Sequence, residues 1–369
     1  MDIESYSRHR DSKMKLFTPG PVFVPEFVRK ELARHNDTHR NKWYSELQQS
    51  VEENLRRLMY TQNDVLIYTS SGTGIMESCM RNLLEEDEYG LVLSCGAFGD
   101  RWYEIGVSCG KQVECLRIDN GAAFKKDIIV EALEKKSYSL VTIQFNETST
   151  GVMNNISDIA SVVKDHGARF CVDAVSGLAG GKIEVDKNKI DVCLASTQKA
   201  LALPAGLAVA SISEEAFSKA ARVKNRGYYF DMILLREMAR KKHQTPTTPP
   251  IHTLRALDVI LDYILNEEGL ENRFARHRKM ANLVKGWAKK RGLKMLPEEG
   301  YESPTVSAIY KGENMDVSWF LGELIQRGYR IVNGYGPLKG KSFRIGHMGE
   351  LTPDDVKELL EVMDSILEQ

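Results

Sequence analysis

Seven short apolar runs, most of them separated by stretches with helical periodicity, constrain the fold of this chain more than any other feature. Strands that alternate with helices build a mostly parallel sheet covered by helices on both faces, an α/β fold. We expect helical segments between the first six runs, whereas the seventh follows its predecessor after a loop and leaves a mixed sheet open. The runs are residues 65–69, 90–94, 113–117, 140–145, 169–173, 191–195 and 207–212.

The pattern changes beyond residue 225, where helical stretches come first and a mixed region follows. Helices are expected over 228–242, 251–268 and 270–292, after an earlier amphipathic one over 38–59. The last hundred residues or so add strand-like runs at 304–310, 329–332 and 342–346 and helices at 316–328 and 352–367. The sequence therefore predicts an N-terminal arm (1–16), a large domain (17–270) and a small α+β C-terminal domain (271–369).

Composition narrows the class of protein. Fifty basic residues against 51 acidic ones leave a net charge of −1, so no general field attracts nucleic acid or membrane. No apolar run reaches the roughly 18 residues of a membrane helix, and the first 15 residues lack the apolar segment of a secretory signal. The six cysteines have no metal-ligand spacing, and we expect buried free thiols and no metal site. These features predict a cytoplasmic protein.

A lysine and an aspartate follow two of the expected strands. Lys199 stands in the segment STQKAL, just after the run 191–195, and Asp173 ends the run 169–173. A lysine that forms a Schiff base and an aspartate that pairs with a pyridinium nitrogen are the two groups that tune pyridoxal phosphate. An isolated lysine is ordinarily a solvated surface charge, but the pair indicates a pyridoxal phosphate site.

Seven motifs then appear in a fixed order from about residue 17 to 350: SSGTGIMES, CGAFGDRW, NETSTGV, VDAVSG, STQKAL, TPTTPP and FRIGHMG. With them the chain resembles the class V aminotransferases, and within these the alanine–glyoxylate and serine–pyruvate group. The resemblance covers nearly the whole chain. It implies the large domain of pyridoxal phosphate fold type I, with a seven-stranded sheet, and assigns Lys199 and Asp173 the catalytic roles.

The turn after the first strand fits a phosphate. Glycines let the backbone approach an anion, while hydroxyls and the N–H groups of a helix start donate to it. A plain Ser/Thr helix cap is the alternative interpretation. The resemblance implies that the cofactor phosphate is held by Ser71, Gly72 and Thr73.

Further cofactor contacts follow from the resemblance alone. Phe98 matches an aromatic ring that stacks on the pyridine, where many family members have tryptophan. Thr148 matches the hydroxyl that bonds the 3′ oxygen of the ring, and Gln198 matches a further phosphate contact. TPTTPP matches a loop that reaches the phosphate of the neighbouring subunit, so that a homodimer with shared active sites is implied. Thr248 fits this contact better than Thr245, but the register stays open.

Arg344, in FRIGHMG, matches the arginine that binds the substrate α-carboxylate, a task that suits the planar guanidinium fork. The implied reaction is a ping-pong transamination through a Lys199 aldimine. In this cycle the freed lysine amine removes the Cα proton and returns it to the cofactor. Small donors (alanine, serine or aspartate) and small acceptors (glyoxylate or pyruvate) are expected.

Three other functions are alternatives to this one. His39-Arg40 resembles a pair that phosphoserine aminotransferases use on the substrate phosphate, and this alternative stays open. A cysteine desulfurase needs a nucleophilic cysteine well after the cofactor lysine, whereas the last cysteine here, Cys193, precedes Lys199. A non-catalytic binding module is disfavoured because the expected lysine, aspartate and arginine are all present.

Overall fold

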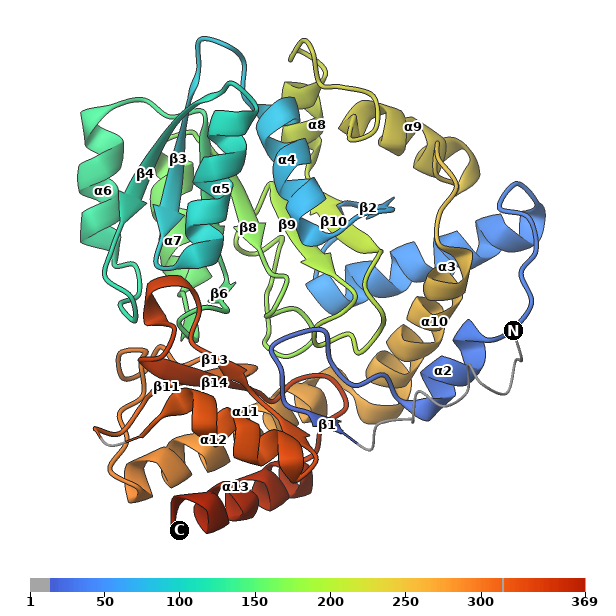
Figure 1. Cartoon of the computed structure of the whole chain (residues 1–369). Coiled ribbons are helices and arrows are strands. Elements are labelled where there is room, and N and C mark those ends of the chain that lie inside the picture. The colour runs from blue at the N-terminus through green and yellow to red at the C-terminus, as the bar shows by residue number, and fades with distance from the viewer. Residues whose placement is uncertain (1–13, 314, 369) are drawn as a thin grey trace, which may run out of the picture.

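A mixed sheet of seven strands forms the centre of the molecule in the computed structural model, which describes residues 14–313 and 315–368 (Figure 1). The antiparallel strand β10 lies between β2 and β9, and the remaining pairs are parallel. The predicted α/β fold and all seven predicted strands are confirmed. In spatial order the strands are β2 (Asp64–Tyr68), β10 (Ala208–Ile212), β9 (Val192–Ser196), β8 (Arg169–Asp173), β5 (Leu140–Gln144), β3 (Tyr89–Ser94) and β4 (Gln112–Arg117).

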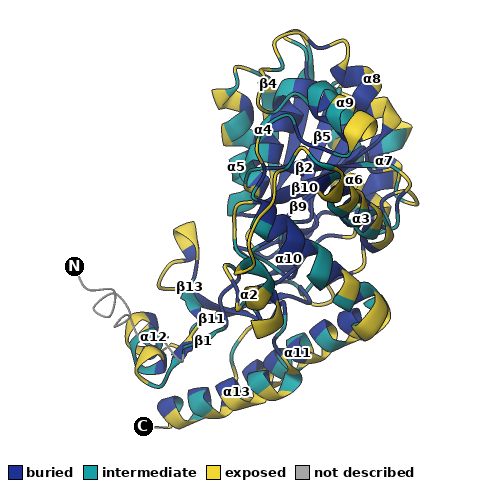
Figure 2. Cartoon of the chain, turned by 90° about the vertical axis from the view of Figure 1, so that its right-hand side faces the viewer, coloured by how far each residue is buried: buried dark blue, intermediate teal, exposed yellow. Residues whose placement is uncertain are grey.

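Both faces of this sheet carry apolar side chains, because successive residues of a strand point to opposite sides. In β2, Val65 and Ile67 join one hydrophobic cluster, whereas Leu66 and Tyr68 join the other. The inner strands are correspondingly buried (Figure 2). The first cluster is completed by α3 (Lys42–Met59), α6 (Lys126–Lys135), α7 (Ile156–Asp165) and α10 (Ile251–Asp262), and the second by α4 (Gly72–Leu83), α5 (Ala97–Ser108), α8 (Glu214–Ala220) and α9 (Met232–Lys242).

One predicted helix is wrong. Residues 174–191, between β8 and β9, form successive turns instead of a helix. Gly180 shows why the segment is irregular: a Cβ there would lie 2.2 Å from Thr305 Cγ2, so the backbone packs directly on the C-terminal part of the chain. The helix predicted over 228–242 begins only at Met232, since the Asp231 side chain accepts the N–H groups of Ile233 and Leu234 and starts the helix there.

The C-terminal region has its own sheet and its own hydrophobic cluster. The strands β11 (Val306–Tyr310), β14 (Ser342–Gly346) and β13 (Val332–Asn333) are antiparallel, and α11 (Leu270–Lys290), α12 (Val317–Gln326) and α13 (Pro353–Leu367) pack with them. Between α10 and α11 the chain forms a π-helix, Tyr263–Glu268. The small α+β domain is thus present, while the exact domain limits stay predictions.

The beginning of the described chain attaches to this C-terminal region. Strand β1 (Lys15–Leu16) pairs in parallel with β12 (Tyr329–Arg330), and the fully buried Phe17 belongs to the C-terminal cluster. Most of the predicted arm, 1–16, lies outside the described residues. Helix α2 (Glu26–Leu32) follows and packs on α10.

No helix within residues 14–313 and 315–368 is long and apolar enough to cross a membrane. The six cysteines are free thiols, and four of them are buried as predicted. Cys109 and Cys115 are only half-buried, because they lie beside the edge of the sheet, at the end of α5 and in the edge strand β4.

Candidate active site

Lys199 and Asp173 meet at the carboxyl edge of the sheet. Asp173 is the last residue of β8, and Lys199 lies in the turn that follows the neighbouring parallel strand β9. Parallel strands bring their carboxyl ends to one edge, which is where ligands of open α/β sheets bind. The Lys199 amine donates a hydrogen bond to the carbonyl of Pro19, so the N-terminal segment also reaches this point.

The surroundings of the half-buried Lys199 side chain lower the pKa of its amine. Burial lowers its pKa from 10.5 to about 8, although the Asp173 carboxylate opposes the shift. The Arg344 and Arg101 guanidiniums lower the pKa further. Its only hydrogen bond in the described chain goes to a carbonyl oxygen and not to a carboxylate.

Asp173 is 5% exposed and accepts the N–H of Val175 at 2.8 Å. Burial raises the pKa of its carboxyl to about 7, and the nearby Glu147 adds to this. The Val175 N–H, Lys199 and Arg101 act in the opposite direction. A cation beside this carboxylate would favour its charged form, which is what a protonated pyridine nitrogen supplies.

The first turn of α4 lies directly against the segment after Asp173. Ser71 precedes the helix with an extended backbone, and its side chain does not cap the helix. A Cβ at Gly72 would lie 2.5 Å from Val175 Cγ2, so glycine is what permits this approach. Ser71 is exposed and Thr73 half-buried. The Ser71 hydroxyl, which makes no hydrogen bond to the described residues, and the helix N–H groups are suited to an anion.

Two orphaned polar atoms support a ligand at this place. Ser196 Oγ is buried without a hydrogen-bond partner among the described residues and lies 3.7 Å from the position of a Gly72 Cβ. Gln198 Oε1, two residues further along, is likewise buried and unpartnered. Because buried polar atoms ordinarily have partners, these two residues fit a bound polar group such as the cofactor.

A glutamate that the sequence reasoning missed holds the start of α5. Glu147 is fully buried in the hairpin of β6 (Asn146–Glu147) and β7 (Val152–Met153). Its Oε2 accepts the N–H groups of Phe98 and Gly99 at 3.1 Å each, and its Oε1 accepts the N–H and hydroxyl of Ser149. Burial raises the Glu147 pKa, and these four donors oppose the shift. The glutamate in the segment ETST indicates an acceptor for N–H groups, but the sequence does not show which helix donates them.

The Phe98 ring lies under a tyrosine of the small domain. Its centroid is 5.7 Å from that of Tyr335, and the Arg101 guanidinium lies 4.6 Å from it on the same helix. Neither Tyr335 nor Arg101 was predicted as a site residue. Tyr335 comes from the loop between β13 and β14, so the small domain covers the aromatic side of the site.

Arg344 links the two domains at the site. It is 6% exposed in β14, and its Nη1 and Nε donate to the carbonyls of Thr148 and Asn333, both at 3.1 Å. Burial lowers its pKa to about 10, while Glu147 opposes the shift. No carboxylate within the described ranges bonds to it, so N–H groups are left for a substrate. The Thr148 hydroxyl bonds to that of Ser176 at 2.6 Å.

Thr245 and Thr248 do not join this cluster within one chain. The buried Thr245 hydroxyl donates to the carbonyl of Thr247 at 2.7 Å, whereas Thr248 is exposed. Arg40 holds the same loop, because it donates to Gln244 and to the carbonyls of Thr245 and Pro246. In the described part of the chain, no hydrogen bond connects either threonine to the surroundings of Lys199.

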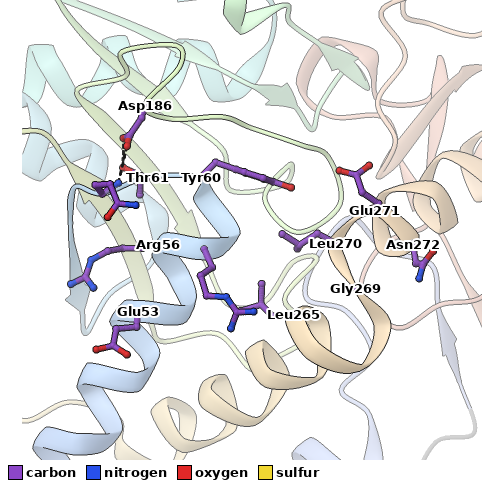
Figure 3. A pocket seen from close by; sticks show the side chains of 12 residues that line it. Glu53, Arg56, Tyr60, Thr61, Asp186, Leu265, Gly269, Leu270, Glu271 and Asn272 are labelled. Carbon is purple, nitrogen blue, oxygen red and sulfur yellow. Dashed lines mark hydrogen bonds between the residues drawn. The ribbon is translucent and has the colours of Figure 1, made fainter.

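Cavity size does not identify the site. A cavity of about 810 Å³ lies between the end of α3 and the start of α11 (Figure 3). Its lining includes Arg56, Tyr60, Asp186 and Glu271, and it contains none of the predicted site residues. A cavity of about 160 Å³ adjoins Tyr335 and the start of α5.

A buried amine beside a buried carboxylate, a helix start open to an anion and an arginine from a second domain define an enzyme of the pyridoxal phosphate fold type I. The family model described as aminotransferase class-V matches residues 26–323, and the chain belongs to this family. Its cofactor is accordingly pyridoxal phosphate, and it is a transferase.

Three known proteins illustrate the similarity. An uncharacterized aminotransferase of Methanocaldococcus jannaschii is 35% identical over 97% of this chain and 93% of its own. The serine–glyoxylate aminotransferase of Methylorubrum extorquens is 31% identical over 93% of this chain and 88% of its own. The crystal structure of an aspartate aminotransferase of subgroup IV from Thermus thermophilus superimposes with a TM-score of 0.89, at 30% identity, over 96% of this chain and 99% of the other.

Proposed function

We propose that this protein moves the amino group of a small amino acid to a small 2-oxo acid by a ping-pong mechanism. Alanine, serine and aspartate are the donors that we favour, with glyoxylate or pyruvate as acceptor. The observation that carries the proposal is the Lys199 amine, which has no carboxylate partner in the described chain and lies beside Asp173. Serine, aspartate and glyoxylate also occur in the names of the similar aminotransferases.

The residues assigned above to the cofactor fit its parts. When bound, pyridoxal phosphate supplies an aldehyde for amines and a protonated ring that withdraws electrons from the substrate Cα. Asp173 would face the ring nitrogen and Lys199 the aldehyde. The ring face, the 3′ oxygen and the phosphate would be held by Phe98, Thr148, and Ser71, Gly72, Thr73 and Gln198.

Lys199 is suited to move the proton. With a pKa of about 8, about a tenth of the amine is neutral at pH 7, far more than for a solvated lysine, and a general base works best when its pKa lies near the working pH. Arg344 would bind the substrate carboxylate with the N–H groups that the two carbonyls leave unused. The substrate Cα would thus be held close to the amine.

The homodimer with shared sites remains part of the proposal. The Thr245 hydroxyl is occupied within its own chain, while Thr248 is exposed and its hydroxyl makes no hydrogen bond in the described residues. This difference favours Thr248 as the residue that reaches the partner subunit's cofactor phosphate. The cytoplasmic location likewise stays a prediction.

Phosphoserine is disfavoured as a donor. That activity would use Arg40 on the substrate phosphate, but Arg40 already donates to Thr245 O at 2.7 Å, and to Gln244 and Pro246 at 3.2 Å each. Releasing the arginine would cost these three hydrogen bonds. The arrangement supports a role for Arg40 in holding the loop that carries Thr248.

The test is a panel of donors and acceptors under initial-rate conditions. Alanine, serine, aspartate and phosphoserine are each combined with glyoxylate, pyruvate and 2-oxoglutarate. We expect parallel double-reciprocal lines, the highest kcat/KM with a small donor, and no transfer by Lys199→Ala. A preference for phosphoserine, intersecting lines, or near-normal transfer by Lys199→Ala would contradict the proposal.

A further inference from the structure

Arg273, which no sequence argument singled out, is completely buried behind Lys199. It lies in α11 with 0% exposure, and its guanidinium donates to two carbonyls from separate turns of the large domain. Nη2 donates to Ala200 at 2.6 Å, and Nε donates to Ala179 at 2.9 Å. Ala200 is the residue directly after Lys199.

The charge of Arg273 is balanced by two glutamates. Nη1 donates to Glu268 at 2.6 Å and to Glu350 at 2.8 Å, and both carboxylates are largely buried. A buried arginine is tolerated only when its charge is paired and its N–H groups are used. The guanidinium therefore has little freedom, and it fixes the two carbonyls in turn.

Both turns contain an alanine in a left-handed backbone conformation. Ala179 has φ 65°, and Ala202 has φ 56°. The N–H of Ala202 donates to the carbonyl of Lys199 at 2.8 Å, so this conformation belongs to the lysine turn itself. Residues with a Cβ disfavour this region, and such strain persists where surrounding contacts hold it.

We propose that Arg273 is a positioning residue for Lys199. By joining the carbonyls of Ala179 and Ala200, it holds the lysine turn in its strained form and sets where the amine stands relative to Asp173. The inference rests on the proposed role of Lys199 as the reacting amine. Arg273 itself touches neither the amine nor, in this arrangement, the place of the substrate.

Arg273→Lys tests the proposal, since a lysine keeps the positive charge beside Glu268 and Glu350 but has no fork for both carbonyls. We expect kcat to fall by about tenfold or more with KM changed less than about threefold, because a small displacement of the amine affects the transition state more than binding. Arg276→Lys is the matched control. Arg276 lies one turn along and bonds to Glu268 and to the carbonyls of Gly349 and Leu351, and within the described residues it makes no hydrogen bond to the lysine turn.

A second readout uses the apoprotein and needs no turnover. The pKa of Lys199 is measured from the pH dependence of its labelling by an amine reagent, followed by mass spectrometry. The charged groups that act on the amine, namely Asp173 from β8, Arg101 from α5 and Arg344 from β14, are unchanged in both variants. A turn that loosens exposes the amine, so Arg273→Lys should raise its pKa from about 8 toward 10.5, and Arg276→Lys should not.

A second substitution that relieves the backbone strain at Ala202 should restore part of the activity. Glycine adopts the left-handed conformation without a Cβ penalty, so Arg273→Lys combined with Ala202→Gly should recover a severalfold part of the lost kcat. If Arg273→Lys does not fold, Glu350→Gln takes its place, because it removes the charge of one of the two carboxylates that hold the guanidinium. The same rise in the Lys199 pKa is then expected.

Three results would overturn the inference: a kcat of Arg273→Lys within about threefold of the parent enzyme, an equal loss in Arg276→Lys, or an unchanged Lys199 pKa in the variant that folds. Failure of the proposed function is distinct from these. It would appear as normal turnover of Lys199→Ala or as no amino transfer by the parent enzyme.

Discussion

Replacing Lys199 by methionine should stabilise the apoprotein at neutral pH while it abolishes amino transfer. Burial lowers the pKa of the amine from 10.5 to about 8, so the folded state binds a proton at this site less readily than the unfolded chain. At about pH 7 the amine is mostly protonated in both states, and the lowering of its pKa to about 8 costs the fold roughly 3 kcal/mol. The hydrogen bond to Pro19 offsets about 1 kcal/mol of this. Methionine fills a similar volume without charge, so a net gain of about 2 kcal/mol is expected.

The stability difference between the parent and the Lys199→Met apoprotein should depend on pH. The cost is fully present below pH 8, where the amine is protonated in both states, and it disappears as the pH rises through 10.5, above which both states are neutral. Urea unfolding of the two apoproteins should therefore show a stability difference that falls by about 2 kcal/mol between about pH 7 and pH 10.

Lys219→Met is the control. Lys219 is 6% exposed and lies 2.8 Å from Glu85 and 2.5 Å from Glu88, so its removal leaves two carboxylates without their cation and should destabilise the protein. A Lys199→Met protein that is no more stable than the parent at about pH 7, or a difference that does not change with pH, would refute the reasoning. It would mean that the amine is solvated or has an anionic partner.

Three further predictions concern the reaction. Asp173→Asn keeps the shape but removes the charge, and single-turnover kinetics should slow by at least about tenfold, or roughly 1.4 kcal/mol of barrier; a smaller loss would contradict the role of Asp173. Arg344→Lys should raise KM for every amino and 2-oxo acid and leave the cofactor spectrum unchanged, whereas loss of cofactor would indicate a structural role instead. Hybrid dimers of Lys199→Ala chains with Thr245→Ala/Thr248→Ala chains should recover cofactor retention at one of two sites, and verified hybrids without recovery would exclude shared sites.

Most of the sheet could be predicted because its inner strands are buried on both faces. The run that becomes β9 is apolar throughout and buried at every position, and such runs stand out without knowledge of their neighbours. The same approach predicted a helix in the segment 174–191, and this prediction is wrong. The turns of this segment are stabilised by distant contacts, such as Gly180 against Thr305, that local periodicity does not report.

The candidate site likewise contains some residues that the sequence predicts and others that it does not. Lys199, Asp173 and Arg344 were predicted because they stand in recognisable motifs. Glu147 and Arg273 were not, because each acts on a backbone far away in the sequence: Glu147 on the start of α5, and Arg273 on the turn after Lys199. A lone buried acid or base has no local signature, and its function exists only once the fold has supplied the partner groups.

The predicted and the unpredicted residues share one physical property, which links stability to cofactor binding. In the described chain the Lys199 amine lacks a carboxylate partner and the buried Ser196 Oγ lacks a hydrogen bond, while burial raises the pKa of Asp173 to about 7. Each is a cost to the protein alone, and each would gain a partner from a group with an aldehyde, a cationic ring and a phosphate. A ligand that binds only the folded state stabilises it by mass action, so the cost left in the apoprotein becomes part of the affinity for the cofactor. On this reasoning the apoprotein leaves polar groups of the site without partners. Substitutions that pair these groups within the protein should raise its stability and lower its affinity for the cofactor.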